Sequence, residues 1–125
     1  MAGYKADRVA EDIKREIVAI IREDIKDPRV KDKLLTVVRV EVSHDLSYAK
    51  AYLSALEGID AAKEAVKGLK SAGGYIRREV GQRLHLRKTP EINFVADDSI
   101  EHGMNIARML HDLSENRTEE TNGGQ

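Results

Sequence analysis

Residues 63–88 read KEAVKGLKSAGGYIRREVGQRLHLRK, and they contain two helical patterns separated by a pair of glycines. Apolar residues recur at helical spacing before residue 70, and again from Ile76 through Val80 to Leu84. Between the two patterns lie Gly73 and Gly74, which make an unbroken helix unfavourable. We therefore expect two helices joined at a kink, the second beginning with unpaired N–H groups and the positive end of its dipole.

The same segment concentrates positive charge. It holds eight lysines and arginines against two glutamates, which gives +6 in a chain whose total charge is −1. Lys63, Lys67 and Lys70 form a stripe at i, i+4 and i+7 on the first helix. Such a face is typical of proteins that bind nucleic acid, whereas the alternative, an ordinary solvated helix face, would include more acids. The residues expected to contact RNA are Lys63, Lys67, Lys70, Ser71, Ala72, Gly73, Gly74, Arg77, Arg78, Arg83, Arg87 and Lys88.

The composition bounds the class of protein. A chain of 125 residues is long enough for one domain with its own core. It has no cysteine, which excludes disulfides, thiolate catalysis and cysteine-based zinc sites. It also has no apolar run near the ~20 residues of a membrane span. We expect a cytoplasmic protein, without membrane contact, whose domain covers residues 1–113. Residues 114–125 contain no apolar residue and are expected to be disordered.

Outside the basic segment, hydrophobic periodicity predicts an α+β domain. The first helix should end at Asp27-Pro28, because the residue before a proline avoids the α region. Asp98 and Glu101 fit a capping box at the start of the last helix. The order α-β-β-α-kink-α-β-α indicates a three-stranded sheet with helices packed on one face. The predicted elements outside the basic segment are a helix at 5–26, strands at 35–43, 48–55 and 91–96, and a last helix beginning near residue 98.

No constellation of residues predicts catalysis, a metal site or a cofactor. The four histidines lack metal-binding spacing. Ser43-His44-Asp45 brings triad residue types together, but without a nucleophile elbow. Asp27-Pro28-Arg29 is expected to be a helix stop in which Arg29 pairs with Asp24 or Asp27. Tyr75 is expected to pack on its neighbours rather than to stack on a base. We therefore expect a protein that is not an enzyme.

Six motifs follow one another along most of the chain. They are Arg8-Val9, Asp27-Pro28-Arg29, VSHDLSYAK at 42–50, AGGYIR at 72–77, LRKTPEINF at 86–94 and DSIEHG at 98–103. In this order and spacing the set resembles the ribosome-binding factor A family, bacterial assembly factors of the small ribosomal subunit. That family is similar to type II KH domains, with an Ala-x-Gly kink where other KH domains carry Gly-x-x-Gly. Ala72-Gly73-Gly74 fits this pattern.

The resemblance implies a KH-like (type II) single domain that binds the immature 30S subunit and its 16S rRNA during late maturation. It also implies support for processing of the 5′ end of the rRNA and a role in growth at low temperature. We expect a monomer that does not bind DNA, since the basic helix is broken and the net charge is not positive. The alternative is a protein-interaction module on the ribosome, without direct RNA contact, that binds through the sheet or the acidic C-terminal helix.

Overall fold

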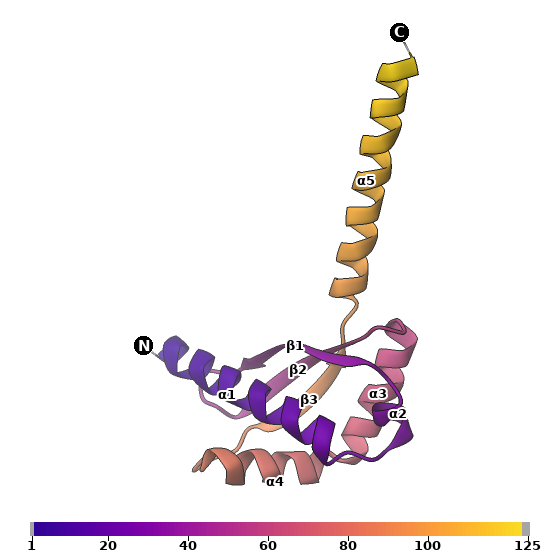
Figure 1. Ribbon diagram of the computed structural model, residues 1–125. Coiled ribbons are helices and arrows are strands. Elements are labelled where there is room, and N and C mark those ends of the chain that lie inside the picture. The colour runs from indigo at the N-terminus through magenta and orange to yellow at the C-terminus, as the bar shows by residue number, and fades with distance from the viewer. Residues whose placement is uncertain (1, 124–125) are drawn as a thin grey trace.

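The computed structural model describes the backbone of residues 2–123 and the side chains of residues 5–99 and 102–115. It is an α+β domain in which helices lie against a three-stranded sheet and one long helix projects away from them (Figure 1). The elements are α1 (Ala2–Glu23), α2 (Pro28–Lys31), β1 (Leu35–Val42), β2 (Tyr48–Ala55), α3 (Ile59–Ser71), α4 (Gly73–Leu84), β3 (Glu91–Ala96) and α5 (Ser99–Gly123). The element order predicted from the sequence is confirmed, and α2 is added to it.

The sheet has the order β1-β2-β3. The β1–β2 hairpin is antiparallel, and β2 pairs in parallel with β3 because α3 and α4 carry the chain back across the sheet. The register of β1 shifts between Val37 and Arg39, which leaves Val38 as a bulge residue. As in any strand, alternate residues of β2 lie on opposite faces of the sheet: Ala51 and Leu53 are fully buried, whereas Tyr48 is exposed.

The core lies between the inner face of this sheet and α1, α3 and α4. Helix α1 covers β1, and α3 covers β2 and β3. One stripe of α1 is completely buried because its isoleucines recur every three or four residues. The largest fully buried side chains are Ile13, Ile17, Ile20, Val30, Leu53, Leu69, Ile76, Val80 and Pro90. Anchoring on both sides of residue 72 fixes α3 and α4 relative to each other.

The segment after α1, where a helix stop was predicted at Asp27-Pro28-Arg29, forms the short helix α2. Asp27 caps this helix, since its Oδ1 accepts the backbone N–H of Arg29 at 2.9 Å. Pro28 occupies the first helical position, where a missing N–H costs nothing. Helix α1 ends at Glu23, before the end predicted at Asp27-Pro28, and Pro28 starts α2 instead.

Helix α5 stands apart from the layered body (Figure 1). At its start the backbone N–H of Asp97 donates to the carbonyl of Leu53 (2.7 Å), and Asp97 Oδ1 accepts the N–H of Ser99. The predicted capping box also involves Glu101, whose side chain lies outside the described ones. The helix continues to Gly123, past residue 113, where the polar composition predicted disorder. The glutamates and the arginine of this segment give it no apolar face, but both residue types have a high helix propensity.

Candidate nucleic-acid interface

The kink predicted in residues 63–88 is present at Ala72. Helix α3 ends at Ser71, Ala72 has φ −96° and ψ 10°, and α4 begins at Gly73. Ala72 bridges the break, because its N–H donates back to the Leu69 carbonyl (3.1 Å) and its own carbonyl accepts the N–H of Ile76 (3.0 Å). Figure 1 shows α3 and α4 running in different directions on either side of this point. The segment is therefore not one straight helix.

Neither glycine at the break is required by the packing of the protein itself. A Cβ atom built on Gly73 or Gly74 would meet no atom of the described chain within 4 Å. Among the described glycines only Gly58 has a positive φ. No side chain in this part of the chain caps the start of α4. The backbone at the break is thus open to an approaching group, and it lies at the positive end of the α4 dipole.

Three cations surround a shallow hollow beside this open backbone. The hollow, which we call the α4 hollow, has a volume of about 550 Å³ and is lined by Gly74, Arg77, Arg78, Lys88 and Thr89. Arg77 Nη2 donates to the carbonyl of Thr89 (3.0 Å), and Lys88 Nζ donates to Ser47 Oγ (3.0 Å). These acceptors are neutral, although Lys88 also lies near enough to Asp45 to help lower the pKa of that carboxyl. Residues from α4 and from the loop before β3 are brought together here.

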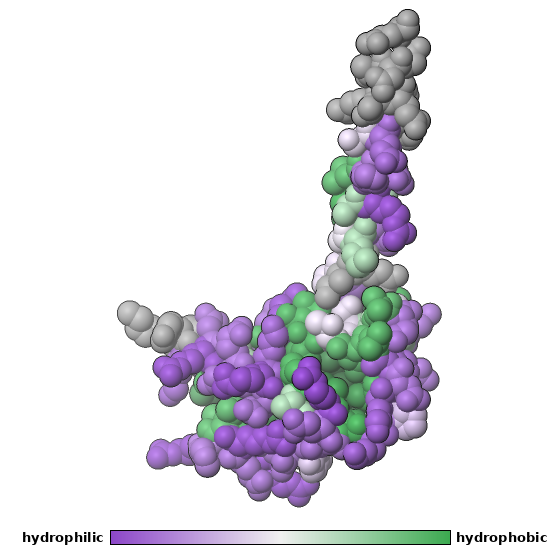
Figure 2. All heavy atoms as spheres, viewed as in Figure 1, coloured by the Kyte–Doolittle hydropathy of each residue, from purple (hydrophilic) through white to green (hydrophobic). Residues whose placement is uncertain are grey.

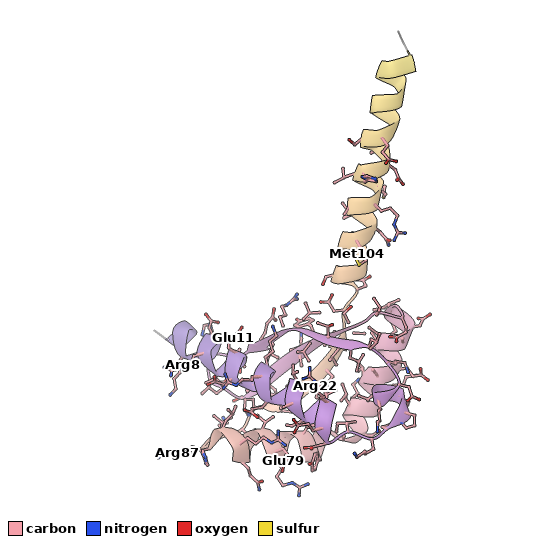
Figure 3. All side chains as sticks on the ribbon, in the orientation of Figure 1. Arg8, Glu11, Arg22, Glu79, Arg87 and Met104 are labelled. Carbon is pink, nitrogen blue, oxygen red and sulfur yellow. The ribbon has the colours of Figure 1, made fainter. Side chains whose placement is uncertain are left out.

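The remaining cations extend the positive surface in both directions. The three lysines of α3 do not line the α4 hollow, and Arg87 lies at the far end of α4 (Figure 3). Five of the predicted cations are exposed and form no ion pair with any described side chain: Lys63, Lys67, Lys70, Arg78 and Arg87. We call these five, together with Arg77 and Lys88, the cationic face.

Arg83, one of the residues predicted to contact RNA, is half-buried and forms ion pairs with three carboxylates of the domain. Its guanidinium lies 3.0 Å from Asp24 Oδ2, 3.3 Å from Glu79 Oε1 and 3.8 Å from Glu16 Oε2. The hydroxyl of Tyr75 donates to the same Asp24 carboxylate (2.9 Å), and this hydrogen bond, with partial burial, raises the pKa of Tyr75. Arg83 and Tyr75 therefore fasten α4 to α1.

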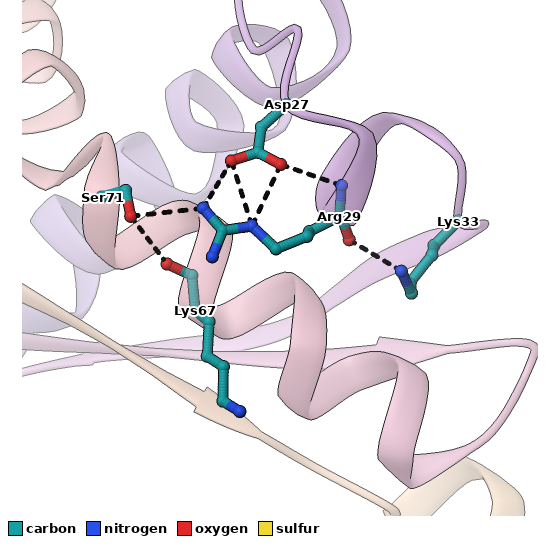
Figure 4. A network of polar contacts seen from close by, with 5 residues as sticks. All are labelled: Asp27, Arg29, Lys33, Lys67 and Ser71. Carbon is teal, nitrogen blue, oxygen red and sulfur yellow. Dashed lines mark hydrogen bonds and ion pairs between the residues drawn. The ribbon is translucent and has the colours of Figure 1, made fainter.

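A second network holds the end of α3 (Figure 4). Arg29 binds both oxygens of Asp27, with Nη2 2.7 Å from Oδ2, and this pairing lowers the pKa of Asp27. The same Nη2 reaches Ser71 Oγ (3.4 Å), and that hydroxyl donates to the Lys67 carbonyl (3.2 Å). The predicted pairing of Arg29 with Asp27 is confirmed. Of the predicted contact residues, Ser71 is thus tied to α2 through its side chain.

On the face of the sheet that no helix covers, the polar side chains contact one another. The Arg39 guanidinium lies 3.9 Å from the centre of the Tyr52 ring, and its Nε donates to Glu41 Oε1 (3.0 Å). Glu41 also accepts the Tyr52 hydroxyl (3.1 Å). These groups are already partnered, in contrast to the cations of α3.

The serine and aspartate of the hairpin turn have a structural role. Ser43 Oγ donates to Asp45 Oδ1 (2.7 Å) and accepts the N–H groups of Ser47 and Tyr48. Hydrogen bonds from Ser43 and from the Ser47 backbone lower the pKa of Asp45 to about 2. Within the described residues no group of three or more His, Asp or Glu side chains is arranged to hold a metal ion. No helix of the described chain has the length and apolarity to cross a bilayer.

Comparisons with known proteins identify relatives over nearly the whole chain. Residues 5–110 match the family profile described as Ribosome-binding factor A. A protein of that name from Clostridium tetani is 48% identical over 116 residues, which are 93% of this chain and 95% of that protein. One from Clostridium botulinum is 45% identical over 118 residues, 94% of this chain and 98% of that protein. The crystal structure of ribosome-binding factor A from Thermus thermophilus is 25% identical, with a TM-score of 0.62 over 73% of this chain and 94% of that one.

Proposed function

Because the chain belongs to the ribosome-binding factor A family, we propose that it binds the immature small (30S) ribosomal subunit and its 16S rRNA through the cationic face. The family is one of binding factors and not of enzymes. The protein then acts as a cytoplasmic monomer during late maturation of the subunit. It supports processing of the 5′ end of the rRNA and growth in the cold, and it does not bind DNA.

The observation that carries this proposal is the α4 hollow at the start of α4. A phosphate there accepts hydrogen bonds from the backbone N–H groups at Gly73 and Gly74. Arg78 supplies a charge with no acidic partner among the described side chains, and Arg77 and Lys88 are held in place by neutral oxygens. Lys70, on the other side of the break, contacts the next phosphate along the strand. Residues of both helices thus bind the sugar-phosphate backbone of the RNA.

This arrangement favours recognition of RNA shape over reading of base sequence. Phosphate contacts carry no sequence information, and few aromatic side chains lie near the cationic face. Tyr75, the one beside the break, has its hydroxyl bonded to Asp24. Selectivity for an assembling subunit therefore comes from the fold of the rRNA around the kink.

The test is charge reversal on both sides of the break. Lys70→Glu with Arg78→Glu removes two phosphate contacts, so the slope of log K against log[salt] for binding to purified small subunits should fall in magnitude by about two units. Lys5→Glu with Lys31→Glu is the matched control, because both lysines are exposed and lie outside the cationic face. The control should keep the wild-type slope.

If the double reversal leaves co-sedimentation with small subunits unchanged, the placement of the site on α3 and α4 is wrong. Binding that is strong but independent of salt would favour the alternative, a protein-interaction module without direct RNA contact. The folded state of each variant is checked by its thermal unfolding curve, which should match the wild type because none of these side chains forms an ion pair with a described residue.

A further inference from the structure

Helix α5 presents an apolar face that nothing in the described chain covers. Ile106, Met109, Leu110 and Leu113 recur at i, i+3, i+4 and i+7, which places them on one side of the helix. Their side chains are 45% to 64% exposed. Figure 2 shows apolar side chains along α5 where it projects from the body. A contiguous exposed apolar face on a helix is typical of a binding surface.

The body of the same molecule does not fit as the partner of this face. An apolar groove of about 940 Å³ opens beside the base of α5 (Figure 2), but the α5 residues that line it are Met104, Asn105 and Arg108. Residues two positions apart in a helix, such as Met104 and Ile106, point in nearly opposite directions. Bending α5 onto the groove would bring Asn105 and Arg108 inward and leave the apolar face outside. The hydrogen bond from Asp97 to the Leu53 carbonyl also fixes the start of the helix.

The charge of α5 indicates what kind of partner it fits. Residues 99–123 contain five acidic residues and two arginines, a net charge of −3. An acidic helix is repelled by RNA phosphates and by another copy of itself. It is attracted to an apolar cleft with a basic rim, and an amphipathic helix laid in such a groove is a common mode of protein recognition. The partner is therefore a basic protein.

The position of α5 allows it to act together with the cationic face. Helix α4 and α5 lie at opposite ends of the molecule (Figure 1). A ribosomal subunit offers both RNA phosphates and proteins that are basic because they bind RNA. Resting on the function proposed above, we propose that α5 is a docking helix that inserts Ile106, Met109, Leu110 and Leu113 into an apolar cleft of a basic protein of the small subunit. RNA and protein are then held at the two ends of one domain.

A photo-crosslinking residue identifies what lies against the apolar face. The full-length chain carries p-benzoylphenylalanine in place of Met109, or in place of His111 as the control on the other side of the helix, and is irradiated while bound to purified small subunits. The Met109 probe should give an RNase-resistant adduct with a subunit protein, and the His111 probe should not. An adduct with rRNA, an adduct with a second copy of the chain, equal adducts from both positions, or no adduct would each overturn the proposal.

A pair of substitutions measures the contribution of the face to affinity. Leu110→Asp with Leu113→Asp should weaken binding to small subunits at least tenfold while leaving its salt slope near the wild-type value. His111→Asp, which adds acidic charge on the opposite side of α5, should change affinity less than twofold. Unchanged affinity of the double variant would overturn the docking role alone, whereas a wild-type chain that does not bind small subunits would overturn the proposed function and this inference together. Thermal unfolding should be unaffected, because these leucines are more than 60% exposed.

Discussion

Replacing Gly73 and Gly74 by alanine separates the needs of the fold from those of a ligand. A Cβ atom at either position meets nothing within 4 Å in the described chain, and neither residue has a positive φ. Alanine in place of glycine gains up to about 1 kcal/mol within a helix, and we take roughly half of this in the first turn. The double substitution should therefore stabilise the protein by about 1 kcal/mol and raise Tm by about 4 °C.

The same change should weaken binding to the small subunit. Two methyl groups would fill the space through which a phosphate reaches the backbone N–H groups at the start of α4. Loss of one charge-assisted hydrogen bond costs about 1.5 to 3 kcal/mol, which is at least tenfold in Kd. The measurements are thermal unfolding and titration of purified small subunits at fixed salt. The stability and the affinity are thus expected to move in opposite directions.

Gly68→Ala is the matched control, because a Cβ there would come within 2.8 Å of Val30 Cγ2 in the core, and Gly68 does not line the α4 hollow. Overpacking of this kind costs about 1 to 3 kcal/mol, so Gly68→Ala should lower Tm. Unchanged affinity of the Gly73→Ala, Gly74→Ala variant would show that no ligand approaches the backbone at the break. A fall in its Tm would show that the break itself depends on glycine.

Two further predictions concern charged side chains that form ion pairs or hydrogen bonds within the protein. Arg83→Met leaves three carboxylates without their shared cation and should lower Tm, whereas Arg15→Met removes a more exposed ion pair and should change Tm little. Binding of small subunits at low temperature should be unaltered in both variants. A binding defect specific to Arg83→Met would show that Arg83 contacts RNA. The pKa of Asp45 lies at about 2 in the folded state against 3.8 for the free side chain, so its contribution to stability is complete above pH 4 and is lost as pH falls towards 2. The free energy of unfolding of Asp45→Asn should therefore fall less steeply with pH across this interval than that of the wild type. Identical acid-unfolding curves would contradict the role of the turn.

The order of elements was readable from local patterns. Alternation of apolar residues placed β2 and β3 with the bounds that the structure has, and the two glycines located the break between α3 and α4 within one residue. These features depend on residues close together in the chain. The interpretation of Asp27-Pro28-Arg29 as the stop of the first helix was wrong, because α1 already ends at Glu23 and Pro28 occupies the first position of α2.

Features that depend on distant partners were not readable. Arg83 has the same sequence context as the exposed arginines near it, and only the fold brings Glu16 of α1 and Asp24, which follows α1, to its side. The sequence predicted a last helix beginning near residue 98, but a local pattern cannot specify what covers the apolar side of a helix. Before α5, Asp97 is held by backbone pairing with Leu53 and its carboxylate accepts the N–H of Ser99, whereas the capping box of Asp98 and Glu101 stays a prediction.

The separation of charge along the molecule affects how it approaches a polyanion. Because the chain is nearly neutral overall, a distant subunit exerts little net pull on it, but the cations at one end and the acids of α5 at the other form a dipole that experiences a torque. Within a few Debye lengths of about 8 Å the molecule is turned so that α4 leads and α5 trails. Encounters are thus orientated before the first contact forms, and added salt should slow association through loss of this alignment.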